Sequence, residues 1–315
     1  MENVPPLPPE LKPTVKFRGL LIGVIVGVLC ELGGYLLLRG QQDEYGEVVF
    51  LLVPFITGFL IALFTPVGTR LMACLLGTLL LSLSVLIFTG LEGYICCLMA
   101  SPLVFGCVCM GAWLGRGFNG RFLRGRKNST PLKLLLLVVM ATVLVAAKDI
   151  ERPYIEKPRY ETFAQSVTLP VPPAQAWELV KSMDRLDAPK PFLLEIGLPV
   201  PQSCTVEKEA VGGKRICYFN SGIIAQEITE WDFPKAMKIK IVNSTLPGRH
   251  WLKFVEASYD FVPAGSNTIV IRKTVISSKL YPLWYWRGFE AWGVQSEHTY
   301  VLSDILRRAK LTANQ

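Results

Sequence analysis

Histidine is nearly missing from this chain of 315 residues, which has only two, His250 and His298. None of its 8 cysteines belongs to a C-x-x-C pair, so the usual spacings of zinc sites and thioredoxin-like motifs are missing. The sequence also has no Ser-His-Asp order, no metal-ligand cluster and no Gly-rich phosphate loop. We therefore expect no metal and no cofactor, and no motif of a known catalytic class identifies a reaction.

Acidic residues are fewer than basic ones, 25 against 33, which gives a formal net charge of +8. Such a charge is compatible with a nucleic-acid partner, but the sequence has no basic stripe with interleaved aromatic residues. Much of the positive charge instead flanks apolar stretches, where Lys and Arg set the orientation of membrane proteins. We expect a bilayer, and no nucleic acid, as the partner.

Hydrophobic residues make up 51% of the chain and its mean hydropathy is +0.37, too high for an ordinary soluble protein. The excess lies before Lys148, in apolar stretches of the length that crosses a bilayer. These stretches cover residues 19–38, 48–64, 71–89, 94–114 and 132–147. We predict a membrane domain of about five transmembrane helices over 1–147, a linker over 148–159 and a second domain over 160–315.

The Lys/Arg bias predicts the orientation. Positive residues gather in the N-terminal segment, up to Arg18, and in the loop over 115–130. Five spans put both on the cytoplasmic side and the C-terminal domain on the other. The weak point is the fifth stretch, because a helix there that fails to span leaves the C-terminal domain in the cytoplasm. We predict an integral protein of a bacterial inner (plasma) membrane, with the C-terminal domain on the non-cytoplasmic side.

Two features of the first apolar stretch raise further alternatives. Gly19, Gly23 and Gly27 form a small-xxx-small row, which favours close helix packing, either in self-association or inside the protein's own bundle. Glu31 is ionisable and lies within a span, so it is a candidate for an ion or proton pathway. No second ionisable residue lies deep in another span, and we therefore interpret Glu31 as hydrogen-bonded or snorkelling.

The second half of the chain has the pattern of a sheet followed by one long helix. A strand predicted over 161–169 precedes a short helix over 174–183 and six more strand-like runs between 203 and 277. In the run 237–243, Met and Ile alternate with Lys, as one buried and one solvated face require. The helix predicted over 282–310 has an apolar face that it must bury. We predict that it closes a curved sheet and forms one wall of an apolar cavity.

Three groups of residues carry a resemblance to a known family. They are VPPAQAWELV over 171–180, GKRICYF over 213–219 with Gly222 and EITEWD over 227–232, and Tyr259 with Pro263, Thr268 and Arg272. This pattern resembles the SRPBCC superfamily of birch-pollen allergen, START lipid-transfer domains and polyketide cyclases. The resemblance covers about half of the chain, from Tyr160 onward. It implies an α+β helix-grip fold, a curved antiparallel sheet closed by a long C-terminal helix, with a hydrophobic ligand between them.

Both arguments lead to the same candidate site. The expected cavity-lining residues are Trp177, Phe219, Trp231, Ile239, Ile241, Val294, His298, Val301 and Leu302, although the same residues would also fit a packed core. His298, Glu227 and Arg215 are weak catalytic candidates, since His titrates near neutrality and the other two are convergent polar groups.

Three functions remain open at this point. The first is a membrane-anchored module that binds a hydrophobic small molecule or lipid. The second is an enzyme of the cyclase/dehydrase or hydrolase kind that uses polar groups in the cavity. The third is a structural or regulatory membrane protein without enzymatic activity.

One cysteine pair lies outside the apolar spans. Cys204 and Cys217 fall on neighbouring predicted strands that flank Gly212 and Gly213. Their distances along the chain from that turn differ by about four residues, so we do not expect them to lie directly opposite each other. The spacing therefore disfavours a disulfide, although an exported domain would permit one.

Overall fold

The computed structural model describes residues 13–39, 46–65, 70–89, 92–123, 130–181, 183–248 and 252–313. The basic residues Arg124, Arg126 and Lys127 of the predicted cytoplasmic loop lie outside these ranges, as does His250. The chain divides into two compact units, one built mainly from residues before Pro153 and one mainly from residues 154–315. Each unit is described by itself.

The first unit is entirely helical in its described residues. Its elements are α1 (Pro13–Arg39), the π-helical turn η1 (Val48–Leu52) continuing into α2 (Val53–Phe64), α3 (Leu71–Phe88), α4 (Tyr94–Phe118) continuing into η2 (Asn119–Leu123), and α5 (Thr130–Ile155). Four helical stretches are long and apolar enough to cross a membrane, judged by length and composition: Phe17–Leu36, Leu71–Phe88, Tyr94–Phe122 and Thr130–Ile155. Many of their apolar side chains are exposed, as lipid-facing residues would be.

Two of the five predicted spans differ from expectation. The second, Val48–Phe64, is a shorter apolar helix, and its 17 or so residues rise only about 26 Å, less than the roughly 30 Å of a hydrocarbon core. The fifth, predicted as a short span, is a helix of 26 residues, Thr130–Ile155, with a rise of about 39 Å. Its last turns contain residues that the sequence predicted to be a linker. They are helical because Lys148 pairs with Glu151 one turn later, and Glu151 accepts a hydrogen bond from the Val48 amide.

The glycine row of α1 packs against the chain's own helices. A Cβ added at Gly23 would clash with Thr65 and Cys74, and one added at Gly27 would clash with Thr78 and Ile61. Only a glycine allows this approach, since any side chain would push the helices apart. The row was expected to serve either self-association or packing inside the bundle. Gly23 and Gly27 serve packing inside the bundle.

The second unit contains a seven-stranded antiparallel sheet that curls into a half-barrel, as the fold class predicted. Its strands are β1 (Arg159–Leu169), β2 (Pro201–Val206), β3 (Lys214–Phe219), β4 (Gly222–Asp232), β5 (Ala236–Ser244), β6 (Leu252–Ala264) and β7 (Asn267–Ser278). Their order in the sheet is β1-β7-β6-β5-β4-β3-β2. Consecutive strands pair as hairpins from β2 to β7, and β1 joins the far edge of β7 with Arg159 opposite Ser278.

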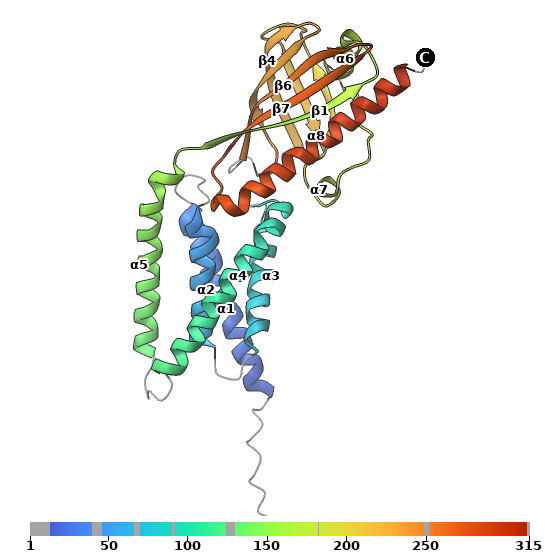
Figure 1. Cartoon of the computed structure of the whole chain (residues 1–315). Helices are drawn as coiled ribbons and strands as arrows, with labels where there is room; N and C mark the ends of the chain where they lie inside the picture. Colours follow the sequence, from blue (N-terminus) through green and yellow to red (C-terminus); the bar gives the residue numbers. More distant parts are fainter. Residues whose placement is uncertain are drawn as a thin grey trace, which may run out of the picture. The chain divides into compact units, whose positions relative to one another are not determined.

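Three helices complete this unit: α6 (Pro173–Lys181), α7 (Phe192–Glu195) and the long α8 (Leu283–Ala313). Figure 1 shows α8 running along the curled sheet. The core between them gathers side chains from α6, α8 and the central strands. Trp177 of α6 is at its centre, with its ring 4.8 Å from that of Trp231 and 5.2 Å from that of Phe261.

Charged side chains at three positions along α8 bind it to the rest of the unit. Glu290 accepts hydrogen bonds from Arg159 of β1 and Ser278 of β7. Glu297 pairs with Arg272 at 2.8 Å. Asp304 is fully buried and accepts a hydrogen bond from the Asp187 amide at 3.0 Å. Since a misplaced helix would leave these groups buried and unpaired, they fix its register along the sheet.

Cys204 and Cys217 form a disulfide, contrary to the sequence-based expectation. They lie directly opposite each other in the β2–β3 ladder, and Val206 opposite Arg215 belongs to the same register. The centre of this hairpin falls near residues 210 and 211, because the amide of Glu207 bonds to the carbonyl of Lys214. The expectation failed because it placed the turn at Gly212 and Gly213, which only end the loop.

Candidate ligand-binding site

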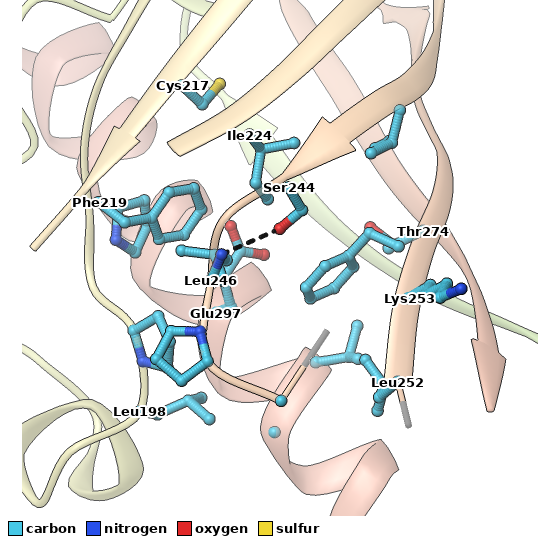
Figure 2. Close-up of a pocket in the computed structure, with 18 of the residues that line it drawn as sticks. Leu198, Cys217, Phe219, Ile224, Ser244, Leu246, Leu252, Lys253, Thr274 and Glu297 are labelled. Carbon is cyan, nitrogen blue, oxygen red and sulfur yellow. Dashed lines mark hydrogen bonds between the residues drawn. The ribbon is translucent and has the colours of Figure 1, made fainter. Parts of the chain in front are cut away.

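A cavity of about 590 Å³ lies between the curled sheet and α8. This volume falls within the range of small-molecule sites, about 300–1,000 Å³. Its wall is mainly apolar, with side chains from the sheet and from α8, and Figure 2 shows part of it. Apolar members include Leu198, Phe219, Ile224, Leu246, Leu252, Phe254, Ala257, Val294 and Val301.

The nine predicted lining residues separate into two groups. Phe219, Ile241, Val294 and Val301 line the cavity. The other five lie outside its wall and are buried or half-buried in the core: Trp177, Trp231, Ile239, His298 and Leu302.

Helix geometry explains the division along α8. Successive residues turn by about 100°, so His298 and Leu302 lie roughly 40° and 80° around the helix from Val294, while Glu297 lies about 60° the other way. One broad face of α8 therefore contributes both to the core and to the cavity. Its His298 side fills the core, and its Glu297 side lines the cavity. Apolar periodicity alone does not separate two such neighbouring arcs.

Arg215 is the most buried charge in the cavity wall, with 3% of its surface exposed. Its Nη1 donates to Gln226 Oε1 at 2.7 Å and lies 3.2 Å from Cys217 Sγ. Gln226 is its direct neighbour in the β3–β4 ladder, so the strand register brings the two side chains to the same face. Burial lowers the pKa of Arg215, because the charged form is desolvated without an acidic hydrogen-bond partner.

A second arginine, Arg272 of β7, also lines the cavity, and unlike Arg215 it is neutralised. Its Nη2 donates to Glu297 at 2.8 Å, and its guanidinium lies 5.4 Å from the centre of the Tyr259 ring. Burial acts to lower the pKa of Arg272, but the charge of Glu297, the hydrogen bond to it and the nearby Tyr259 together outweigh burial, so the pKa is raised. Figure 2 shows Glu297 among the apolar side chains of the strands.

The other two catalytic candidates lie away from the cavity. Glu227 follows Gln226 on β4 and therefore points to the opposite, exposed face of the sheet, where it is paired in register with Lys214. His298 is fully buried, and its Nε2 lies 2.7 Å from Thr274 Oγ1. Burial and the nearby charge of Arg272 lower the pKa of His298 to about 3, so its ring is neutral near pH 7. Of the three candidates, only Arg215 reaches the cavity wall.

The sequence analysis did not select Gln226, Arg272 or Glu297 as site residues. A signal for Glu297 exists, since Glu290 and Glu297 are seven residues apart and thus share a helix face with Val294. Arg272 was noted only as part of the family pattern. Within the described ranges, no group of three or more His, Cys, Asp or Glu side chains has the arrangement of a metal site.

One comparison with known proteins identifies a family for the second half of the chain. A family model described as polyketide cyclase/dehydrase and lipid transport matches residues 161–309. No curated protein matches the chain.

Among solved structures, norcoclaurine synthase from Thalictrum flavum, in complex with dopamine and hydroxybenzaldehyde, is 11% identical. That match covers 51% of this chain and 91% of the synthase, with a TM-score of 0.35. The ZhuI aromatase/cyclase from Streptomyces sp. R1128 is 13% identical over 48% of this chain and 94% of its own, with a TM-score of 0.36. A START superfamily protein from Mycobacterium smegmatis is 10% identical over 47% and 97%, with a TM-score of 0.34.

The family match spans nearly all of the sheet and of α8, so it includes the strand residues and the helix face that line the cavity. Residues 161–309 are therefore a polyketide cyclase/SRPBCC domain, which in this chain follows an N-terminal helical region with four long apolar helices.

Proposed function

We propose that this protein is a membrane-anchored module that binds a hydrophobic small molecule or lipid in the cavity between the sheet and α8. The observation that carries the proposal is the cavity itself, about 590 Å³ with a mainly apolar wall. The family's description, which includes lipid transport, supports it. Each buried methylene of a ligand would contribute about 0.8 kcal/mol to the free energy of binding. A chain of about ten methylenes would therefore contribute about 8 kcal/mol before the cost of association is subtracted.

The proposed ligand contacts are the predicted residues that line the cavity, Phe219, Ile241, Val294 and Val301. They come from two strands and from α8, so an apolar ligand would touch both sides of the half-barrel. His298, Trp177 and Leu302 would support this wall from behind without touching the ligand.

The membrane domain over 1–147 would hold this cavity close to the bilayer, where apolar molecules concentrate. We place the C-terminal domain on the non-cytoplasmic side, which requires the shorter helix Val48–Phe64 to cross the membrane together with the four long ones. The disulfide between Cys204 and Cys217 supports that side, because such bonds persist in oxidising compartments and are rare in the cytosol.

Filling the cavity tests the proposal. Ala257 of β6 lines the cavity, whereas Val262 of the same strand is 43% exposed and lies outside it. Full-length protein is purified from membranes in mild detergent, and co-purifying small molecules are identified by native mass spectrometry. We expect a bound apolar molecule in the wild type and in the control variant Val262→Trp, and its loss in Ala257→Trp.

Two results would count against the module. One is a cavity that carries nothing and takes up no member of a lipid panel. The other is equal retention of the bound molecule by Ala257→Trp and Val262→Trp, which would place binding elsewhere on the protein.

A further inference from the structure

The charges around the cavity do not cancel. Arg272 is neutralised by Glu297, and Glu290 is neutralised by Arg159. Arg215 has no acidic partner among the described residues, since the atoms it contacts belong to Gln226 and Cys217. His298 is neutral near pH 7. Lys253 also lines the cavity, but it is exposed to solvent. Arg215 is therefore the buried positive charge of the wall that lacks an acidic partner among the described residues.

The unpaired donors of Arg215 have a specific geometry. Nη1 is occupied by Gln226, while Nε and Nη2 are buried and have no hydrogen-bond partner in the described part of the chain. These two nitrogens form one edge of the planar guanidinium, the edge on which two parallel N–H bonds meet the two oxygens of a carboxylate. Leaving such donors buried without partners is costly, so a ligand that supplies acceptors gains from the pairing.

We propose that the ligand is an acidic amphiphile whose carboxylate binds the Nε–Nη2 edge of Arg215 and whose apolar part fills the remainder of the cavity. This inference rests on the proposed function and adds the chemical class of the ligand. The buried, uncompensated charge of Arg215 and its free two-donor edge match a single carboxylate. A purely apolar ligand would seal Arg215 into the cavity without a counter-charge, which is unfavourable.

The remaining wall favours an amphiphile over a small polar acid. Phe219 lies on the same strand as Arg215, β3, and Ile224 lies on the neighbouring strand β4. Both are apolar, and the wall continues with Val294 and Val301 of α8. A short carboxylic acid would use Arg215 but would leave this apolar wall without contacts. A long-chain carboxylic acid satisfies both parts of the cavity.

The test compares binding of the same acyl chain with and without a carboxylate charge. The probes are a long-chain fatty acid with a fluorophore at the far end of the chain, and its methyl ester. Both are titrated into full-length protein in non-ionic detergent for the wild type, Arg215→Gln, Arg215→Lys and Lys240→Gln. Lys240 is exposed on β5 and lies outside the cavity wall. The variant Lys240→Gln therefore removes one positive charge of the protein without changing the cavity. Because each probe is compared between variants at one detergent concentration, its partition into micelles cancels.

We expect Arg215→Gln to weaken binding of the acid at least tenfold and to leave binding of the ester within about twofold. Arg215→Lys should give an intermediate loss, since it keeps the charge but not the two-donor edge, and Lys240→Gln should bind both probes like the wild type. Retained ester binding also shows that each variant is folded.

If Arg215→Gln loses affinity equally for the acid and the ester, or loses no affinity for the acid, the carboxylate assignment is overturned. The proposal of an apolar binding module would still stand. A wild type that binds neither probe would contradict the proposed function itself. If Arg215→Gln does not fold, the Arg215→Lys comparison decides, and an unchanged affinity for the acid there would overturn the role of the two-donor edge.

Discussion

Acidification should destabilise the C-terminal domain through His298. Its ring is buried and neutral, and its pKa falls from an ordinary value of 6.5 to about 3. Between these two values the unfolded chain binds a proton that the folded domain does not, so stability falls as pH falls through this window. Each pH unit in the middle of the window corresponds to about 1.4 kcal/mol. The expected loss is about 2 kcal/mol between pH 7 and pH 5, with about 1.3 kcal/mol more by pH 4.

The assay is unfolding of the full-length protein in detergent, followed by tryptophan fluorescence. Six of the 7 tryptophans lie after residue 153, so the signal reports mainly the C-terminal domain. The comparison protein is His298→Gln, which keeps a polar group near Thr274 but does not titrate. Every carboxylate and the other histidine are shared by the two proteins, so their contributions cancel in the difference between the two pH profiles.

The wild type should lose stability on acidification relative to His298→Gln by the amounts given. Parallel profiles for the two proteins would refute the reasoning, because they would mean that His298 titrates in the folded domain as it does in the unfolded chain. A wild type that gains stability at low pH relative to the variant would show that the folded domain favours the charged ring.

Two further predictions concern covalent and packing features. The double variant Cys204→Ala/Cys217→Ala should lose about 3 kcal/mol of stability, since the bond closes a loop of 13 residues, and an unchanged unfolding midpoint would contradict this. In α4, Gly111→Ala should destabilise the helical unit by about 1–3 kcal/mol, because its Cβ would collide with the backbone of α2. Gly106→Ala in the same helix meets nothing within 4 Å and is the matched control for thermal unfolding in detergent; equal midpoints for the two variants would refute this packing.

The strands and the long helix were predictable because their patterns are local. Alternation of Met237, Ile239 and Ile241 with lysines reports a sheet with one wet face, and the spacing along 282–310 reports a helix. The end of α5 was less predictable, since Lys148 and Glu151 look like linker residues but pair one turn apart inside a helix. Charge alone does not separate a linker from the end of a helix.

The details of the site were less accessible, because they depend on long-range registration. Whether Val294 or His298 faces the cavity depends on a rotation of α8 by a few tens of degrees, which ion pairs to β1 and β7 set. Whether Arg215 meets Gln226 or Glu227 depends on the β3–β4 register, where a shift of one residue exchanges the two faces.

The pairing of β1 with β7 has a consequence for biosynthesis. Arg159 emerges from the ribosome shortly after α5, but its partner Ser278 follows roughly 120 residues later. At about 5–20 residues per second, the first strand must wait on the order of ten seconds for its neighbour, and longer for α8 to cover it. Throughout that delay β1 has no strand to pair with, and the apolar face that α8 later covers stays open to other chains.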